Sequence, residues 1–258
     1  MNNSSYQFTS VILQSERITV DVELRDVVTD LDIFEHLDKP YLTGKILLID
    51  NENFLQESDL LGGEKIIVTV KSFREETSAI TKTFYISKIS ATEKAQDNVQ
   101  VIGLDLIEDI SFISNLQVVN RSYLGRISEI LNKINFNYLN NKPITTSNTD
   151  FDSIKVIIPN LEPLHAFKWL CNRAKTNDGY PFYLYSTFAR NELQFFDLGT
   201  LLKTSVINPN VPYRQNSAAA RSYEPDIRRR TMLTHQFSSG AELLELIQKA
   251  LIGANYEY

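Results

Sequence analysis

The stretch Leu60–Val70, LLGGEKIIVTV, decides the fold expected for this chain. Its two glycines, Gly62 and Gly63, indicate a turn, and the β-branched run Lys65–Val70 that follows them predicts a strand. Four more stretches on either side predict strands in the same way: Ile18–Leu24, Lys45–Ile49, Thr81–Ile89 and Asn98–Asp105. Five strands at short spacing, with little helix between them, predict a small antiparallel barrel or sandwich over residues 1–118.

The pattern changes beyond the last of these strands, and residues 119–203 predict a mixed α+β domain. Two segments have apolar residues at helical spacing, Ser122–Ile134 with Ser122 as N-cap and Pro163–Thr176 with proline in its first turn. The latter is expected to bury Phe167, Leu170 and Cys171. Three segments predict strands: Ile154–Ile158, Phe182–Ser186 and Glu192–Phe196. The polar run Asn140–Asp150 predicts a loop.

The C-terminal part predicts a linker and then the beginning of another domain. Residues 204–225 are rich in Asn, Pro, Ser and Ala, which is typical of a linker. Residues 226–258 predict a strand, a helix at Ala241–Leu251 and the start of a further strand. We expect an incomplete second barrel here, and the fold class is therefore α+β with mostly β structure.

Composition excludes several classes of function. A formal net charge of −6 argues against a protein that tracks nucleic-acid phosphates, which needs a basic face. No apolar run approaches the roughly 20 residues that span a bilayer, and Met1–Tyr6 lacks the features of a signal peptide. We therefore expect a soluble protein made in the cytoplasm, with no membrane-spanning segment.

No residue pattern predicts an enzyme, a metal site or a cofactor. The histidines His36, His165 and His235 are scattered and match no ligand spacing. The single cysteine, Cys171, is expected to lie in the core, since His165 six residues earlier would face another side of the helix. Two pairs of acids resemble the paired carboxylates of a glycosidase, Glu108 with Asp109 and Asp150 with Asp152, but strand alternation separates the first pair and a polar loop solvates the second.

Two further clusters have a structural and a functional interpretation. The aromatic residues are expected mainly in the core, or else in an exposed interface: Tyr180, Phe182, Tyr183, Tyr185, Phe188, Phe195 and Phe196. The basic run Arg228, Arg229 and Arg230 is either a solvated surface or a docking patch for an acidic neighbour.

The order of these elements resembles the baseplate hub proteins of contractile-tailed phages of the T-even type, and more distantly the tail-hub proteins of secretion machines. The resemblance covers nearly the whole chain as a pattern, without a catalytic motif. It rests on these stretches: Asp32–Asp50 (DIFEHLDKPYLTGKILLID), Leu60–Val70, Phe84–Ile89 (FYISKI), Val99–Leu106 (VQVIGLDL), Ser122–Ile134, Ile157–Pro159 with Pro163–Ala174, and Thr231–Leu251.

The resemblance implies a non-enzymatic virion protein of the tail baseplate, assembled in the host cytoplasm. Hub proteins of this type carry two similar barrels per chain, and three chains form a ring of pseudo-sixfold symmetry that joins the tail tube to the central spike. The implied partners are two further copies of the chain, the tail tube protein, the central spike protein and other baseplate proteins. This chain departs from the pattern because only the first barrel and the insert are complete, so another chain or further residues would supply the second barrel.

A ring needs contact surfaces, and we expect them on two strands of the first barrel. The candidate contacts are Lys45, Leu47 and Ile49 on one strand, and Lys65, Ile67 and Thr69 on the other. Two other functions remain as alternatives. One is a tail-associated peptidoglycan hydrolase, and the other is a receptor- or carbohydrate-binding module that uses the aromatic cluster between Tyr180 and Phe196.

Overall fold

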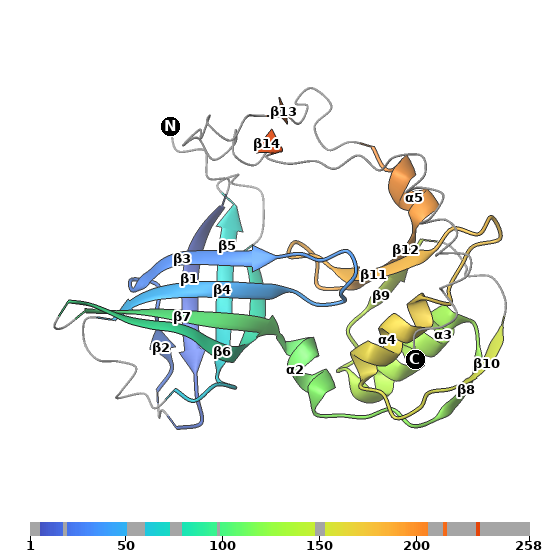
Figure 1. Cartoon of the computed structure of the whole chain (residues 1–258), viewed down its shortest axis with the longest axis horizontal. Coiled ribbons are helices and arrows are strands. Elements are labelled where there is room, and N and C mark those ends of the chain that lie inside the picture. The colour runs from blue at the N-terminus through green and yellow to red at the C-terminus, as the bar shows by residue number, and fades with distance from the viewer. Residues whose placement is uncertain are drawn as a thin grey trace, which may run out of the picture. The chain divides into compact units, whose positions relative to one another are not determined.

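A curled antiparallel sheet organises the first half of the chain in the computed structural model (Figure 1). Its seven strands are β1 (Tyr6–Gln14), β2 (Val22–Glu23), β3 (Val28–Phe34), β4 (Thr43–Asp50), β5 (Lys65–Ser72), β6 (Ile80–Gln96) and β7 (Val99–Glu108). They lie in the order β2-β1-β5-β6-β7-β4-β3. The structure describes residues 6–17, 20–50, 60–72, 79–96, 99–147, 153–205, 214–215 and 231–232.

A short connection brings the two edges of this sheet together at one corner. β2 lies on one edge and β3 on the other, yet only Leu24–Val27 separates them in sequence. The amide of Leu24 donates to the carbonyl of Val11 in β1 (2.7 Å), and the carbonyl of Val27 accepts from the amide of Ile49 in β4 (2.9 Å). The sheet is therefore an incompletely closed barrel, which confirms the predicted mostly-β α+β class.

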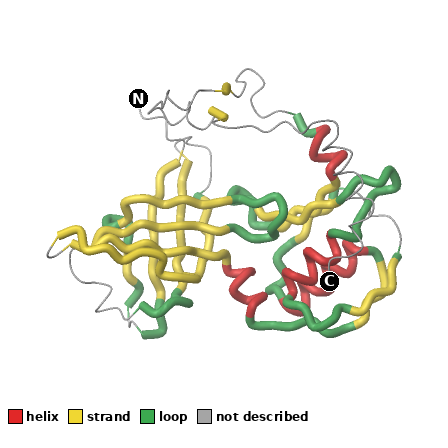
Figure 2. Tube along the Cα trace, viewed as in Figure 1, coloured by secondary structure: helices red, strands yellow, loops and turns green. Residues whose placement is uncertain are grey.

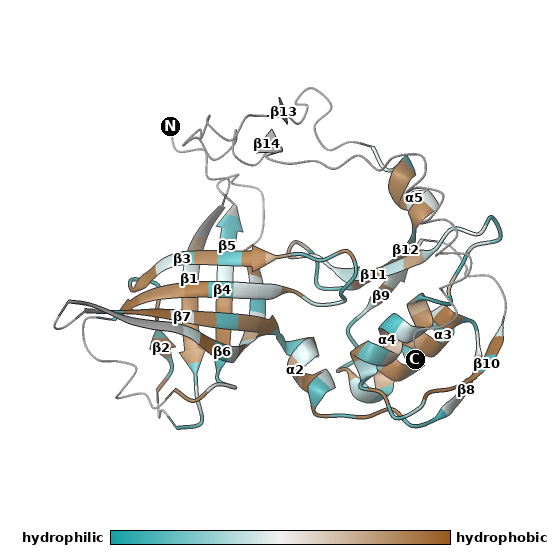
Figure 3. Ribbon diagram, in the orientation of Figure 1, coloured by the Kyte–Doolittle hydropathy of each residue, from teal (hydrophilic) through white to brown (hydrophobic). Residues whose placement is uncertain are grey.

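Alternation along the strands builds the core of the curled sheet. In β4 the side chains of Ile46 and Leu48 are buried, whereas their neighbours Lys45 and Leu47 are exposed or half-buried. Figure 3 shows hydrophobic residues along much of β4 and β7. Irregularities in the β6–β7 register, including one between Ile86 and Lys88, interrupt the long hairpin, and bulges of this kind increase the local twist.

The sequence located four strands of this sheet and missed two. The predicted strands at 45–49, 65–70, 81–89 and 98–105 correspond to β4, β5, β6 and β7. The expected strand Ile18–Leu24 is wrong in extent: β2 covers only Val22–Glu23, and Val20 is exposed. Strands β1 and β3 were not predicted. No element is predicted from the sequence at Tyr6–Gln14, and a loop or helix is favoured at the start of the hairpin that contains β3.

The second half of the described chain has two small sheets and four helices. The helices are α2 (Asp109–Asn115), α3 (Ile127–Tyr138), α4 (Pro163–Cys171) and α5 (Leu198–Lys203). One sheet has the order β11-β12-β9, from β11 (Phe182–Ser186), β12 (Leu193–Asp197) and β9 (Ile144–Thr146). The other is an antiparallel two-stranded ribbon of β8 (Ser122–Gly125) and β10 (Ile154–Ile157). Figure 2 shows these helices and strands with the loops between them.

A second hydrophobic core holds this half together. Phe167, Leu170 and Cys171 of α4 are buried in it, as predicted, with Ile130 and Ile134 of α3 and Phe195 of β12. Helices α3 and α4 each carry hydrophobic and hydrophilic residues (Figure 3), as helices with one buried side do.

Several boundaries predicted from the sequence are wrong in this half. The helix expected at Ser122–Ile134 begins at Ile127, because Ser122–Gly125 pairs as β8 and Arg126 is the N-cap. Gly125 has a positive φ of 141°, so the chain turns sharply between strand and helix. Helix α4 ends at Cys171 rather than Thr176, and the loop expected at Asn140–Asp150 contains β9. Helices α2 and α5 were not predicted.

The chain divides into two units, Ser5–Lys203 and a second formed by Met1–Ser4 with Thr204–Tyr258. In the second unit the structure describes a parallel pair, β13 (Arg214–Gln215) with β14 (Thr231–Met232). The predicted linker and the predicted second barrel lie otherwise outside the described residues, as do their boundaries at 225 and 226.

A buried carboxylate, Glu108 at the end of β7, joins the curled sheet to the α+β part. Its side chain is 2% exposed, and Oε2 accepts the amide of Leu42 at 2.8 Å. Oε1 binds Nζ of Lys142, from the loop between α3 and β9, at 2.5 Å and lies 3.9 Å from Nζ of Lys82 in β6. Lys82 in turn donates to the carbonyl of Arg190, in the turn between β11 and β12, at 2.6 Å. Burial lowers the pKa of Lys82, and the neighbouring Lys142 lowers it further.

Replacing Glu108 is expected to destabilise the fold strongly. In Glu108→Leu two ammonium groups remain buried without their anion, which costs about 3–5 kcal/mol. Urea unfolding followed by circular dichroism measures the free energy of unfolding. The same change at exposed Glu16 is the control, and about 0.5 kcal/mol or less is expected there. The triple variant Glu108→Leu, Lys82→Met, Lys142→Met should recover much of the loss. A loss below about 1 kcal/mol in Glu108→Leu would contradict the role assigned to this cluster.

Candidate interaction surfaces

The six predicted ring-contact residues all lie on the outer face of the curled sheet. They are Lys45, Leu47 and Ile49 of β4, and Lys65, Ile67 and Thr69 of β5, each exposed or half-buried. Residues between them in sequence, such as Ile46 and Ile66, are buried on the inner face. The structure thus gathers each set on one face, and ring contact through them stays a prediction.

Neither of these strands offers a free edge. β4 pairs with β7 and β3, and β5 pairs with β1 and β6. Because their main-chain groups already bond to neighbours on both sides, a strand from another copy has nothing to pair with there. Contact through this face would have to use side chains.

A row of alternating charges crosses the outer face. Lys45 stands opposite Asp105 of β7 on one side and opposite Asp32 of β3 on the other. Asp105 in turn stands opposite Lys88 of β6. Opposite charges facing each other across strands contribute roughly 0.2–1 kcal/mol per pair. Lys45 therefore has a structural role within the sheet, whether or not it also contacts a partner.

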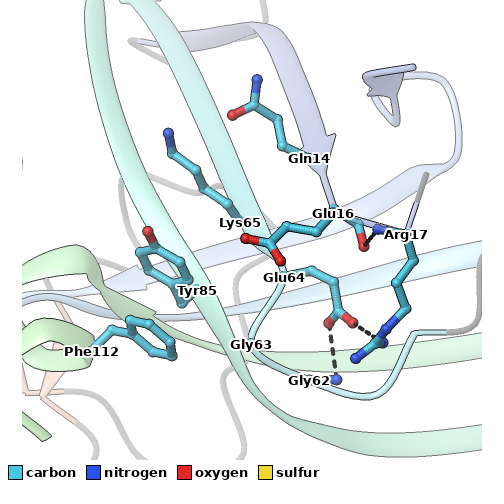
Figure 4. A pocket seen from close by; sticks show the side chains of 10 residues that line it. Gln14, Glu16, Arg17, Gly62, Gly63, Glu64, Lys65, Tyr85 and Phe112 are labelled. Atoms are coloured by element: carbon cyan, nitrogen blue, oxygen red, sulfur yellow. Dashed lines mark hydrogen bonds and ion pairs between the residues drawn. The ribbon is translucent and has the colours of Figure 1, made fainter. Parts of the chain in front are cut away.

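A groove of about 610 Å³ lies where β1 ends and β5 begins (Figure 4). Its wall is the glycine turn before β5, in which Gly62 and Gly63 have positive φ values of 100° and 85°. The buried carboxylate of Glu64 holds this turn, because Oε2 accepts the amide of Gly62 (2.9 Å) and Oε1 accepts that of Leu61 (3.0 Å). Arg17 reaches the same carboxylate at 3.2 Å.

An aromatic pair completes the lining of the groove. The rings of Tyr85 from β6 and Phe112 from α2 stack with centroids 4.1 Å apart and planes 6° apart. The remaining lining is polar and of mixed sign, including Gln14, Glu16 and Lys65 (Figure 4). The groove is open, and the described residues that line it include no histidine or cysteine. The sequence indicated the glycine turn but not the aromatic pair, which comes from elements distant in sequence.

The two histidines that the structure describes, His36 and His165, have separate partners. Nε2 of His36 is 2.8 Å from Oγ1 of Thr43, and His165 is exposed beside Glu162. His235 lies outside the described residues. Across the described ranges, no group of three or more His, Cys, Asp or Glu side chains is placed to hold a metal ion.

The paired acids do not form a glycosidase-like pair in the described part of the chain. Glu108 is bound to Leu42 and Lys142, and Asp109 begins α2, where its Oδ1 accepts the amide of Ile110. Burial raises the pKa of Asp109, and the adjacent charge of Glu108 raises it further. Asp150 and Asp152 lie outside the described residues.

The aromatic cluster is divided between the core and the surface. Phe182 and Phe195 are buried and stack at 4.5 Å between ring centroids. Tyr183, Tyr185, Phe188 and Phe196 are half-buried, and Tyr180 is exposed.

Two other expectations concern the basic run and membrane-spanning helices. The basic run Arg228, Arg229 and Arg230 lies outside the described residues, so its docking role stays a prediction. Among the helices that the structure describes, none is long and apolar enough to cross a bilayer.

The thiol of Cys171 is expected to be unreactive in the folded chain. Burial raises its pKa to about 12, so the thiolate, the form that reacts, is rare at pH 8. Iodoacetamide labelling followed by mass spectrometry should be at least about 100-fold slower in the native chain than in 6 M urea. Equal rates in the two conditions would show that Cys171 is accessible.

No family model and no curated protein matches the chain. Among solved structures it is similar to a tail protein from Neisseria meningitidis MC58, with 13% identity, a TM-score of 0.45, and coverage of 74% of this chain and 50% of that one. It is similar to the 43 kDa tail protein of prophage MuSo2 from Shewanella oneidensis, with 8% identity, a TM-score of 0.46, and coverage of 72% and 52%. A component of the type VI secretion system from E. coli has 10% identity, a TM-score of 0.44, and coverage of 73% and 52%.

These similar structures belong to the two classes that the sequence resemblance named, phage tails and secretion machines. The chain spans about half the length of each of the three.

Proposed function

We propose that the chain is a non-enzymatic structural subunit of a phage tail, of the baseplate-hub type. In this role three copies form a ring in the baseplate of the virion, assembled in the host cytoplasm, that adapts the tail tube to the central spike. Its partners are further copies of itself, the tail tube protein, the spike protein and other baseplate proteins. It needs no cofactor in this role.

One observation carries the proposal: an incompletely closed antiparallel barrel is followed by an α+β part in the same compact unit. This is the element order for which the sequence resembles hub proteins, with β4 to β7 on the stretches that carry the resemblance. The ion pair and hydrogen bond of Glu108 support the proposal, because a subunit that transmits force between the tail tube and the spike needs its two parts fixed to one another.

Free edges also suit a ring. Among the residues that the structure describes, β3 pairs with β4 alone, and β2 pairs with β1 at Ile12 and Leu13 alone. The two edges of one sheet differ in sequence, so a contact between copies that uses them is heterologous. Heterologous contacts generate closed rings when the rotation between neighbours is right.

A cryo-EM reconstruction of intact tails from the source particle tests the role directly. Density for three copies in a ring between tube and spike is the expected result. A position at the fibre tips would contradict the proposal and favour a receptor-binding module.

Charged substitutions on the outer face test the predicted ring contact. Leu47→Lys with Ile67→Lys places two charges on half-buried positions, where the cost to folding should stay near 1 kcal/mol. If this face forms the ring contact, sedimentation velocity should show at least a tenfold weaker self-association. Leu202→Lys, on exposed α5, is the matched control and should change neither property. Unchanged association of the double variant, with the fold intact, would exclude the outer face.

A further inference from the structure

The free edge of the curled sheet is acidic. β3 has the sequence VTDLDIF, in which Leu31 and Ile33 pack against the core of the sheet while Asp30 and Asp32 are exposed. Residues 25–38 hold five carboxylates and one guanidinium: Asp26, Asp30, Asp32, Glu35, Asp38 and Arg25. Exposed Phe34 and Leu37 lie in the same segment. Charges on an edge strand discourage indiscriminate pairing, and they also make the edge selective for a basic partner.

The β8–β10 ribbon has the opposite character. It consists of two paired strands, and in the described part of the chain neither strand pairs with anything else. Tyr123 and Val156 turn one side of the ribbon to the core. Leu124 and Ile157, on the other side, are 66% and 67% exposed. The carbonyl of Leu124 in β8 accepts a hydrogen bond from Nζ of Lys133 (3.3 Å), whereas β10 has no strand on its other side in the described part of the chain. A strand pair with an open edge and large apolar side chains in water is a surface suited to accepting another strand.

Four cations surround this exposed side. They are Arg121, Arg126, Lys133 and Lys155, all of them exposed. None of the four forms a side-chain ion pair with a residue that the structure describes. Among the described residues beside these cations, the acid Glu129 is engaged in the capping box of α3, where its carboxylate accepts the amide of Arg126 at 3.2 Å. In a chain of net charge −6, this is a local basic surface.

We propose that the β3 edge of one copy docks on the β8–β10 ribbon of a second copy. This proposal rests on the proposed function, and the contact between β3 and the ribbon is the one that closes the ring. Main-chain hydrogen bonds join the open edge of β3 to an open edge of the ribbon, and Asp30 and Asp32 approach the cations beside β8 and β10. Leu124 and Ile157 are covered in the complex.

Charge complementarity is what identifies a second copy as the occupant. The ribbon is complementary to an acidic, partly apolar strand with a free edge, and β3 has all three properties. Because each copy carries both surfaces, each donates β3 to one neighbour and accepts β3 from another. Such a head-to-tail contact is heterologous and builds a ring without any further partner.

Charge reversal followed by charge exchange tests the contact in the full-length chain. Asp30→Lys with Asp32→Lys, and separately Arg121→Glu with Lys155→Glu, should each weaken self-association at least tenfold in sedimentation velocity. Each then places like charges across the interface. Mixing the two variants should restore a heterodimer, since the unmodified β3 edge of one variant meets the unmodified ribbon of the other and the two reversed surfaces also match in charge. Asp178→Lys and Lys168→Glu, at exposed positions away from both surfaces, are the matched controls and should associate as the unmodified chain does.

Cysteine cross-linking supplies a second readout that does not depend on charge. A chain with Asp32→Cys mixed with one carrying Leu124→Cys should form a disulfide-linked dimer under mild oxidation. Neither variant alone should match that yield, and buried Cys171 should not contribute. Cysteine placed at exposed Lys168 instead of Leu124 is the control.

Each outcome decides the question. Weakened association in the single-surface variants, restored by mixing, supports the contact. If the unmodified chain associates and neither charge reversal weakens that association, the contact between β3 and the ribbon is overturned. The hub role then stands, and another surface forms the ring. A chain that neither associates nor cross-links also overturns it, and the tail reconstruction then judges the hub role separately.

Discussion

The buried carboxylate of Glu108 is the constraint on which the rest of the described structure depends. It ends β7, accepts the amide of Leu42 beside β4, and neutralises ammonium groups on β6 and on the loop before β9. A charge removed from water is tolerable only with such partners. The partners come from both parts of the compact unit, so losing Glu108 would leave Lys82 and Lys142 unpaired at the junction. The junction is therefore specified by charge as well as by apolar packing.

This arrangement leaves the surfaces of the sheet available for assembly. The inner face is filled by the core, and the outer face presents half-buried side chains with a row of alternating charges. Within the curled sheet, β2 and β3 are the strands that have a neighbouring strand on one side only among the described residues. The acidic β3 edge and the basic β8–β10 ribbon lie on different elements of one unit, as a subunit with a donor side and an acceptor side requires.

Strong local patterns were predicted well, and elements that depend on context were not. Lys65–Val70 alternates apolar and polar residues, and its strand was located correctly. Ser122–Gly125 was assigned to a helix because Leu124 continues the helical spacing of Ile127 and Ile130. Its pairing with Ile154–Ile157, about thirty residues later, makes it a strand instead. β3 was missed although Leu31 and Ile33 alternate with Asp30 and Asp32, which is the period of a strand with one face in the core.

The sequence by itself determined the mostly-β class, the positions of the central strands along the chain, the core position of Cys171 and the burial of one face of α4. These follow from residue periodicity, which is local information. Only the tertiary structure decided which strands are edges, which charges meet at Glu108 and which apolar residues stay in water. Those properties depend on contacts between residues far apart in sequence. A local pattern of residues does not specify which distant residues come into contact.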